Sequence, residues 1–262
     1  MKERIVSMGK YEGKKAVVTG GTHGIGLAVV RALLDGGAEV LLTGRNEKNI
    51  EAVRTELAGR PAHVVRSDAG SMADITALGG IVGEKLDRID FLFVNVGYAE
   101  LGSLEEVTEA AFDKSFDINT KGAFFTTQQL APLVNDGGSI VFTTAVLVGH
   151  GYPGTSVATG MKAAVGGFAK VFAAELLPRK IRVNSVSPGF TLTPTMGYAN
   201  MTEEEKAANE KEGAQLTPLG RHAEPEEIAA AVLYLGFDAT FSTGSVLHAD
   251  GGMGQGIPPL FE

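Results

Sequence analysis

The sequence predicts an α/β fold in which a parallel sheet is covered by helices on both faces. Short apolar runs rich in Val, Ile and Phe alternate regularly with amphipathic segments of helical length. The apolar runs show little alternation of apolar and polar residues, which is typical of strands buried on both faces. No linker, repeat or low-complexity segment interrupts this order, so we expect residues 1–262 to form a single domain.

The strands and helices can be assigned in chain order. The predicted strands are 15–19, 38–43, 62–67, 91–95, 139–144, 181–186 and 245–250. The predicted helices are 24–36, 47–58, 71–87, 109–133, 155–178 and 224–236. Pro225 and acidic residues mark the start of the last helix, and Gly236 marks its end. Strands joined by helices in this way form a doubly wound sheet with right-handed crossovers. The polar, helix-prone segment 201–215 is interpreted as an excursion from the sheet and a flap.

Composition excludes several classes of site. The formal net charge of −8 argues against binding to nucleic-acid backbones, which requires clustered Lys and Arg. The chain has no cysteine, so disulfides, thiolate metal sites and cysteine nucleophiles are excluded, and we predict no metal site. No signal-peptide pattern and no apolar run of membrane-spanning length occurs in the sequence. A cytoplasmic location without membrane attachment is therefore the expectation.

A glycine-rich turn directly follows the first predicted strand and opens the first helix. Its glycines are Gly20, Gly24 and Gly26, in the order G-x-x-x-G-x-G. Glycine at such a junction lets the backbone approach a pyrophosphate, which then lies at the positive end of the helix. A tight strand–helix junction would also use glycine, but the position after the first strand favours a dinucleotide site.

Residues after the second and third strands bear on the choice of cofactor. The second strand ends at Thr43 and Gly44, followed by Arg45, where an acidic residue would favour NAD(H). Arg45, with His23 available in the first loop, suits a 2′-phosphate and predicts NADP(H) in preference to NAD(H). A solvated loop cation is the alternative for Arg45. Asp68 is expected either to accept from an adenine amino group or to cap the helix that starts near Ser71.

With these motifs in place, nearly the whole chain resembles the short-chain dehydrogenase/reductase family. The matching stretches are "TGGTHGIG", "SDA", "NVG", "DIN", "RVNSVSPG", "TPLGRHAEPEEIA" and "HADGG". The resemblance implies a seven-stranded Rossmann-like sheet, a substrate lid near 191–216, a small carbonyl or alcohol substrate, and a homodimer or homotetramer. It implies ketoreductase chemistry, that is, hydride transfer between nicotinamide and a carbonyl or alcohol.

The resemblance also implies which residues hold the cofactor. These are Gly20, Thr22, His23, Gly24, Ile25, Gly26, Arg45, Asp68, Ala69, Asn95, Val96, Gly97, Lys162, Pro188, Gly189, Phe190, Thr191 and Thr193.

The sequence departs from the family pattern at two of the catalytic positions. In the family a tyrosine protonates the carbonyl oxygen, a serine holds that oxygen, a lysine lowers the pKa of the tyrosine, and an asparagine helps to fix a water. Asn119 and Lys162 match the asparagine and the lysine. Ala158 occupies the place of the tyrosine and Ala145 that of the serine. Both oxygen-bearing groups are therefore missing, and we expect reduction to be very slow or absent.

Neighbouring hydroxyls are poor substitutes. Thr144 should face away from position 145, because successive strand side chains point to opposite sides. Thr159 lies off the helix face that Ala158 and Lys162 share. The substrate pocket is expected to include Tyr98, Val146, Tyr152 and Phe190. Tyr152 or Tyr98 is a candidate replacement acid, although packing in the pocket wall explains each of them as well.

Three interpretations of the two alanines remain open. The chain is an inactivated form of an active reductase, or a divergent member that uses Lys162 as a base or Schiff-base amine. Alternatively, it is a non-catalytic subunit that senses NADP(H) or serves a partner.

Overall fold

The computed structural model describes residues 9–195 and 202–258 and contains the predicted parallel sheet. Seven parallel strands lie in the order β3-β2-β1-β4-β5-β6-β7. They are β1 (Lys15–Val18), β2 (Glu39–Gly44), β3 (Ala62–Arg66), β4 (Ile89–Val94), β5 (Val134–Thr143), β6 (Arg182–Pro188) and β7 (Val246–Ala249). All seven predicted strands are confirmed. β5 begins earlier than predicted, because Val134 pairs with Ile89 ahead of an irregularity in the ladder.

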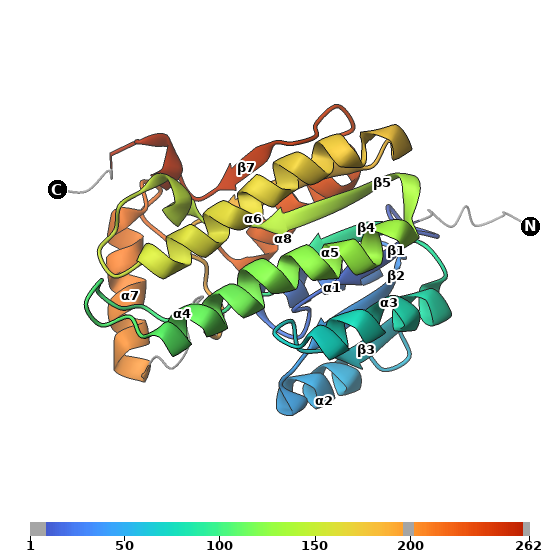
Figure 1. Cartoon of the computed structure of the whole chain (residues 1–262), viewed down its shortest axis with the longest axis horizontal. Coiled ribbons are helices and arrows are strands. Elements are labelled where there is room, and N and C mark those ends of the chain that lie inside the picture. Colours follow the sequence, from blue (N-terminus) through green and yellow to red (C-terminus); the bar gives the residue numbers. More distant parts are fainter. Residues whose placement is uncertain (1–8, 196–201, 259–262) are drawn as a thin grey trace, which may run out of the picture.

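Helices cover both faces of this sheet, as predicted. The α-helices are α1 (Gly24–Asp35), α2 (Glu47–Glu56), α3 (Met72–Leu86), α4 (Glu109–Phe116), α5 (Gly122–Leu130), α6 (Ser156–Glu175), α7 (Glu203–Leu216) and α8 (Pro225–Leu233). One core cluster joins α1, α2 and α8 to the sheet, and a second joins α3, α5 and α6 to its other face. Figure 1 shows α3, α5 and α6 in front of the strands.

The sequence of α1 shows why these layers form. Its buried residues are Gly26, Ala28, Val29, Val30, Leu33 and Leu34, whereas Arg31 and Asp35 are exposed. This spacing places an apolar stripe along one side of the helix, and the stripe packs against the sheet. Gly37, which adopts a left-handed backbone at φ 91°, ends the helix in the manner typical of glycine.

The predicted helix over 109–133 is divided in the structure. A π-helical turn, Asp117–Lys121, separates α4 from α5, and a 3-10 turn, Ala131–Leu133, follows α5. The side chains of 109–133 follow a helical pattern throughout, so the sequence did not reveal the interruption. π turns often occur at functional sites, and this one contains Asn119.

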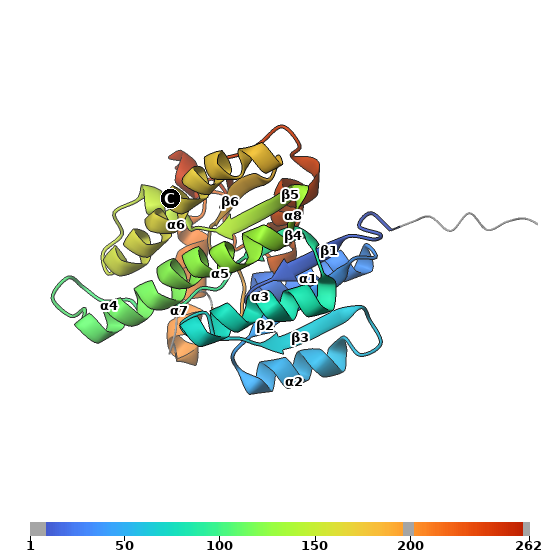
Figure 2. The same cartoon turned by 45° about the vertical axis from the view of Figure 1, so that its right-hand side comes forward.

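The order of the strands determines where a ligand can lie. The chain runs from β1 outward to β3 and then crosses to β4 on the other side of β1. In open α/β sheets, ligands bind beside the carboxyl ends of the strands at such a reversal. Helix α7 stands beyond this end of the sheet, outside both helical layers (Figure 2). The expected lid near 191–216 includes this helix. Residues 196–201 of the expected lid lie outside the described part of the chain.

Candidate active site at the carboxyl end of the sheet

A cavity of about 700 Å³ lies at the carboxyl ends of the central strands. Its walls come from the loops that follow β1 to β6 and from one side of α6. The predicted site residues that line it are Gly20, Thr22, His23, Gly24, Ile25, Arg45, Asp68, Ala69, Asn95, Val96, Gly97, Tyr98, Asn119, Ala145, Val146, Ala158, Lys162, Pro188, Gly189, Phe190, Thr191 and Thr193. The structure thus brings nearly all of the predicted cofactor and catalytic positions together.

The glycine turn has a backbone that only glycine adopts easily. Gly20 and Gly24 have positive φ angles of 64° and 53°. Gly26 does not line the cavity; a Cβ there would collide with the carbonyl oxygen of Gly20 and lie 2.8 Å from Asn95 Nδ2. Gly26 therefore allows the helix to pack closely against the turn, while Gly20 and Gly24 face the cavity.

The start of α1 fits an anionic group. No acidic residue lies in its first turn, whereas the first turns of α2, α3 and α4 contain Glu47, Asp74 and Glu109. His23, the N-cap residue, makes no side-chain capping bond, and its buried Nδ1 has no hydrogen-bond partner. Burial lowers the pKa of His23. The free helix N-terminus and the unpartnered imidazole nitrogen together fit a phosphate of a dinucleotide.

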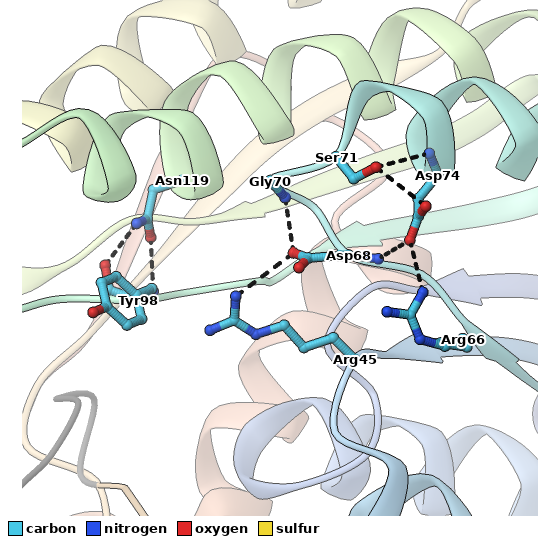
Figure 3. A network of polar contacts seen from close by, with 8 residues as sticks. All are labelled: Arg45, Arg66, Asp68, Gly70, Ser71, Asp74, Tyr98 and Asn119. Carbon is cyan, nitrogen blue, oxygen red and sulfur yellow. Dashed lines mark hydrogen bonds and ion pairs between the residues drawn. The ribbon is translucent and has the colours of Figure 1, made fainter. Parts of the chain in front are cut away.

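Arg45 and Asp68 face each other across the cavity rim. Arg45 Nη1 lies 3.6 Å from Asp68 Oδ1, which also accepts a hydrogen bond of 3.0 Å from the amide of Gly70 (Figure 3). Helix α3 is capped by Ser71, whose hydroxyl accepts from the amide of Asp74. The prediction that Asp68 caps this helix is therefore wrong, because the shorter serine side chain next to the helix already fills that role.

Polar contacts connect the glycine turn to Lys162. Asn95 Nδ2 donates to the carbonyl of Gly20 at 3.4 Å, and Asn95 Oδ1 accepts from the hydroxyl of Thr143 at 3.0 Å. The backbone carbonyl of Thr143 in turn accepts from Lys162 Nζ at 3.0 Å. These contacts link the ends of β4 and β5 to the N-terminal half of α6.

Asn119 uses its side chain to hold the loop after β4. Its Nδ2 donates to the carbonyl of Tyr98 at 2.6 Å, and its Oδ1 accepts from the amide of Tyr98 at 3.1 Å (Figure 3). Nδ2 also donates to the carbonyl of Ser115 at 2.8 Å. A Cβ at Gly97 would lie 3.9 Å from both Asn119 Oδ1 and Lys162 Nζ. The polar ends of Asn119 and Lys162 therefore both lie close to this glycine.

Alanine side chains form the wall next to Lys162. Ala158 is buried and packs with Ala99 and Met161, and Ala145 also lines the cavity. The hydroxyl of Thr144 donates to the carbonyl of Val186 at 2.9 Å. Thr159 Oγ1 lies 3.3 Å from the hydroxyl of Thr155 and does not line the cavity. Both threonine hydroxyls are therefore engaged elsewhere.

The two tyrosines of the predicted pocket have different surroundings. The hydroxyl of Tyr98 donates to Glu100, and Lys114 Nζ lies 4.4 Å from the centre of the Tyr98 ring. Tyr152 does not line the cavity; its ring stacks on His150, with 5.4 Å between the ring centres. The structure thus brings Tyr98 into the cavity wall and leaves Tyr152 outside it.

Lys114 lines the cavity and was missed in the sequence. Its ammonium group lies 3.5 Å from Glu100. In a regular helix, residues 114 and 119 would be about 140° apart around the axis. The π turn changes this relation, and no local sequence pattern predicted that turn.

Helix α7 lies against the loop after β6. The ring of Phe190, which lines the cavity, lies 5.3 Å from that of the buried His222. A Cβ at Gly213 of α7 would lie 2.8 Å from the Phe190 ring. On the opposite side, a Cβ at Gly24 would lie 3.2 Å from Thr193 Cβ. The loop after β6 therefore touches both α7 and the glycine turn.

Within residues 9–195 and 202–258, no group of three or more His, Asp or Glu side chains is arranged to hold a metal ion. In the same ranges, none of the helices has the length and apolar character needed to cross a membrane.

The buried lysine makes stability depend on pH. Desolvation lowers the pKa of Lys162 from 10.5 to about 8. Between these values the unfolded chain binds a proton that the folded chain does not, so the free energy of unfolding rises with pH. Relative to Lys162→Met, the parent chain is expected to gain up to about 3 kcal/mol between roughly pH 7 and pH 10. Urea unfolding of both chains across this range measures the difference.

The exposed Lys170, on the same helix, supplies the control. The stability of Lys170→Met should follow that of the parent at every pH. Parallel profiles for the parent and Lys162→Met would contradict a depressed pKa at Lys162.

Comparison with known proteins agrees with the fold. The family model described as enoyl-(acyl carrier protein) reductase matches residues 20–254. An uncharacterized oxidoreductase of Methylorubrum extorquens is 37% identical over 94% of this chain and 100% of its own length. A solved short-chain dehydrogenase/reductase family protein is 38% identical, with a TM-score of 0.81 over 93% of this chain and 99% of that one. A short-chain dehydrogenase of Burkholderia cenocepacia, solved in complex with NADP, is 29% identical, with a TM-score of 0.83 over 93% and 99% of the two chains.

The doubly wound sheet and the glycine turn at its switch point define a scaffold of the dinucleotide-binding oxidoreductase class. Together with these matches, they show that the chain belongs to the short-chain dehydrogenase/reductase family.

Proposed function

We propose that this chain binds NADP(H) in the cavity and has lost nearly all of the carbonyl reduction for which its scaffold is built. One observation supports this above all: Ala145 and Ala158 line the same cavity as Lys162 and Asn119. The groups that orient the site are therefore present, whereas the two hydroxyls that would hold and protonate a carbonyl oxygen are absent.

The size of the loss follows from the chemistry of the missing groups. A general acid typically contributes about 10²–10⁴-fold to a rate, and one donor to a developing oxyanion about 10²–10³-fold. These factors do not multiply freely, because such groups act as a unit. The bound nicotinamide would supply a hydride, but no side-chain hydroxyl at position 145 or 158 is available to the substrate oxygen.

NADP(H) is favoured by the charge at the rim. Arg45 is partly exposed, lines the cavity and has only the carboxylate of Asp68 as an ion-pair partner among the described residues. A guanidinium in this position can add a bidentate contact to a 2′-phosphate. The related dehydrogenase of Burkholderia cenocepacia was solved with NADP, which agrees with this choice.

Calorimetric titration and a turnover assay test the proposal together. The unmodified chain is expected to bind NADPH, while NADPH absorbance stays constant in the presence of ketones, aldehydes or quinones. Rapid oxidation of NADPH with any of these substrates would contradict the loss of activity, and absence of NADPH binding would contradict the cofactor assignment.

Replacing Arg45→Asp should exchange the cofactor preference. Loss of a charge-assisted contact costs about 1.5–3 kcal/mol, so NADPH affinity is expected to fall roughly 10–100-fold. NADH affinity should be retained, because its ribose carries no phosphate. Calorimetry with both cofactors measures the change.

The variant Arg54→Asp makes the same charge change on α2, outside the cavity, and serves as the control. If both variants weakened NADPH binding equally, a general effect of net charge would replace the specific contact at Arg45.

We further propose that the protein is cytoplasmic and assembles as a homodimer or homotetramer. Large apolar side chains at the surface, among them the fully exposed Phe241 and the half-exposed Val171, are consistent with contacts between copies.

A further inference from the structure

Lys162 is a buried amine with one backbone partner. The residue is 9% exposed, and its Nζ donates to the carbonyl of Thr143 at 3.0 Å. Among the described residues no carboxylate forms an ion pair with it. The ammonium form therefore gains no opposite charge in exchange for the water it loses.

The amine of Lys162 therefore loses its proton more easily than an exposed lysine does. Burial lowers the pKa of Lys162 to about 8, so a substantial fraction is unprotonated under mildly alkaline conditions. The exposed Lys170, two turns further along α6, has no such burial. A neutral amine is the nucleophile in Schiff-base chemistry, and desolvation is a recognised way to activate it.

Much of the cavity wall that includes Lys162 is apolar, and neither position 145 nor position 158 carries a hydroxyl. Ala145 and Ala158 line the cavity together with Lys162, and Val146, Leu147, Met161 and Phe190 extend the same apolar surface. Neither alanine can hydrogen-bond to Nζ or block it with a long side chain. An apolar aldehyde, aromatic or branched, matches this lining better than a charged one.

We propose that Lys162 captures apolar aldehydes as a reversible imine in this cavity. The lone pair of neutral Nζ attacks the carbonyl carbon, and a proton passes from nitrogen to oxygen to give a carbinolamine. Solvent water protonates the hydroxyl, which departs as water while the nitrogen lone pair forms the C=N bond. The hydroxide left behind by that solvent water then takes the remaining N–H proton, which gives the neutral imine. One amine and one aldehyde thus give one imine and one water, with no change of oxidation state. This activity goes beyond the proposed function and does not depend on hydride transfer from the cofactor.

Trapping with cyanoborohydride tests the proposal on the full-length, unmodified chain. Benzaldehyde is added near neutral pH, cyanoborohydride reduces any imine to a stable secondary amine, and peptide mapping by mass spectrometry locates it. The expected result is modification of Lys162 at least about tenfold faster than of Lys170. Saturating NADPH should slow modification of Lys162 but not of Lys170, because the cofactor would occupy the same cavity.

Two variants provide matched controls. Lys162→Met should lose the fast adduct, and Lys170→Met should keep it. Modification of Lys162 no faster than of Lys170 in the parent chain would overturn the proposal, and this comparison holds even if Lys162→Met fails to fold. Fast trapping at Lys162 without protection by NADPH, combined with no calorimetric NADPH binding, would instead overturn the proposed function and leave the imine chemistry standing.

Discussion

The double variant Ala145→Ser, Ala158→Tyr is expected to reduce carbonyl compounds with NADPH about 10²–10⁴-fold faster than the parent chain. Lys162 lies one helical turn from position 158 on the same helix, and position 145 lines the same cavity. A phenol and a hydroxyl introduced there would face the substrate oxygen, and the lysine would help to stabilise the phenolate. Initial rates of NADPH oxidation with ketones, aldehydes and quinones measure the gain.

The control places the same side chain on the outer face of α6. Ala163 is exposed and does not line the cavity, so Ala145→Ser with Ala163→Tyr should leave the rate near that of the parent. If the Ala158→Tyr double variant binds NADPH yet gains no rate on any substrate, the inactivated-reductase interpretation fails. A cofactor-sensing or partner subunit would then account better for the chain.

The variant Gly26→Ala is expected to lose both stability and affinity for NADPH. The new Cβ would collide with the carbonyl oxygen of Gly20 and crowd Asn95 Nδ2, both of which belong to the rigid base of the turn. Crowding in a packed region costs about 1–3 kcal/mol of stability. Displacement of the turn should also weaken its amide contacts to a pyrophosphate, so NADPH affinity is expected to drop roughly 10–100-fold. Calorimetry and urea unfolding measure the two losses.

Gly80 offers a control for the same chemical change. It is an exposed glycine within α3, and a Cβ there would meet no atom within 4 Å. Gly80→Ala should leave NADPH binding unchanged and raise stability by up to about 1 kcal/mol through helix propensity. Unaltered affinity and stability in Gly26→Ala would show that the turn can relax, contrary to the close packing of α1.

The fold was predictable because the strands and the helices each leave a clear pattern of apolar residues in the sequence. Strands buried on both faces leave continuous apolar runs, and helices such as α1 leave an apolar stripe, so both periods are visible in the chain. The ends of elements were less visible. The early start of β5 depends on Val134 pairing with Ile89, a contact between segments far apart in the sequence.

The site was predictable where its chemistry depends on glycine or on order along the chain. The turn at Gly20 and Gly24 could be predicted because its backbone requires glycine. Lys162 could be predicted because it occupies a lysine position of the family pattern. Lys114 gave no comparable signal, because its position depends on the interrupted helix between α4 and α5. The stacking of Tyr152 on His150 is likewise a loop contact that no periodicity encodes.

The π-helical turn at Asp117–Lys121 interrupts the regular helix, and the position of Asn119 in the site depends on that interruption. Each residue of an ordinary helix rotates the chain by about 100°, so a chain shortened by one residue here would rotate Asn119 and everything before it relative to α5. The shortened helix would have uniform hydrogen bonding. However, the side-chain amide of Asn119, which hydrogen-bonds to the backbone of Tyr98, would move away from Gly97. A more regular helix would therefore come at the expense of this part of the cavity wall, because the position of Asn119 depends on the irregular turn.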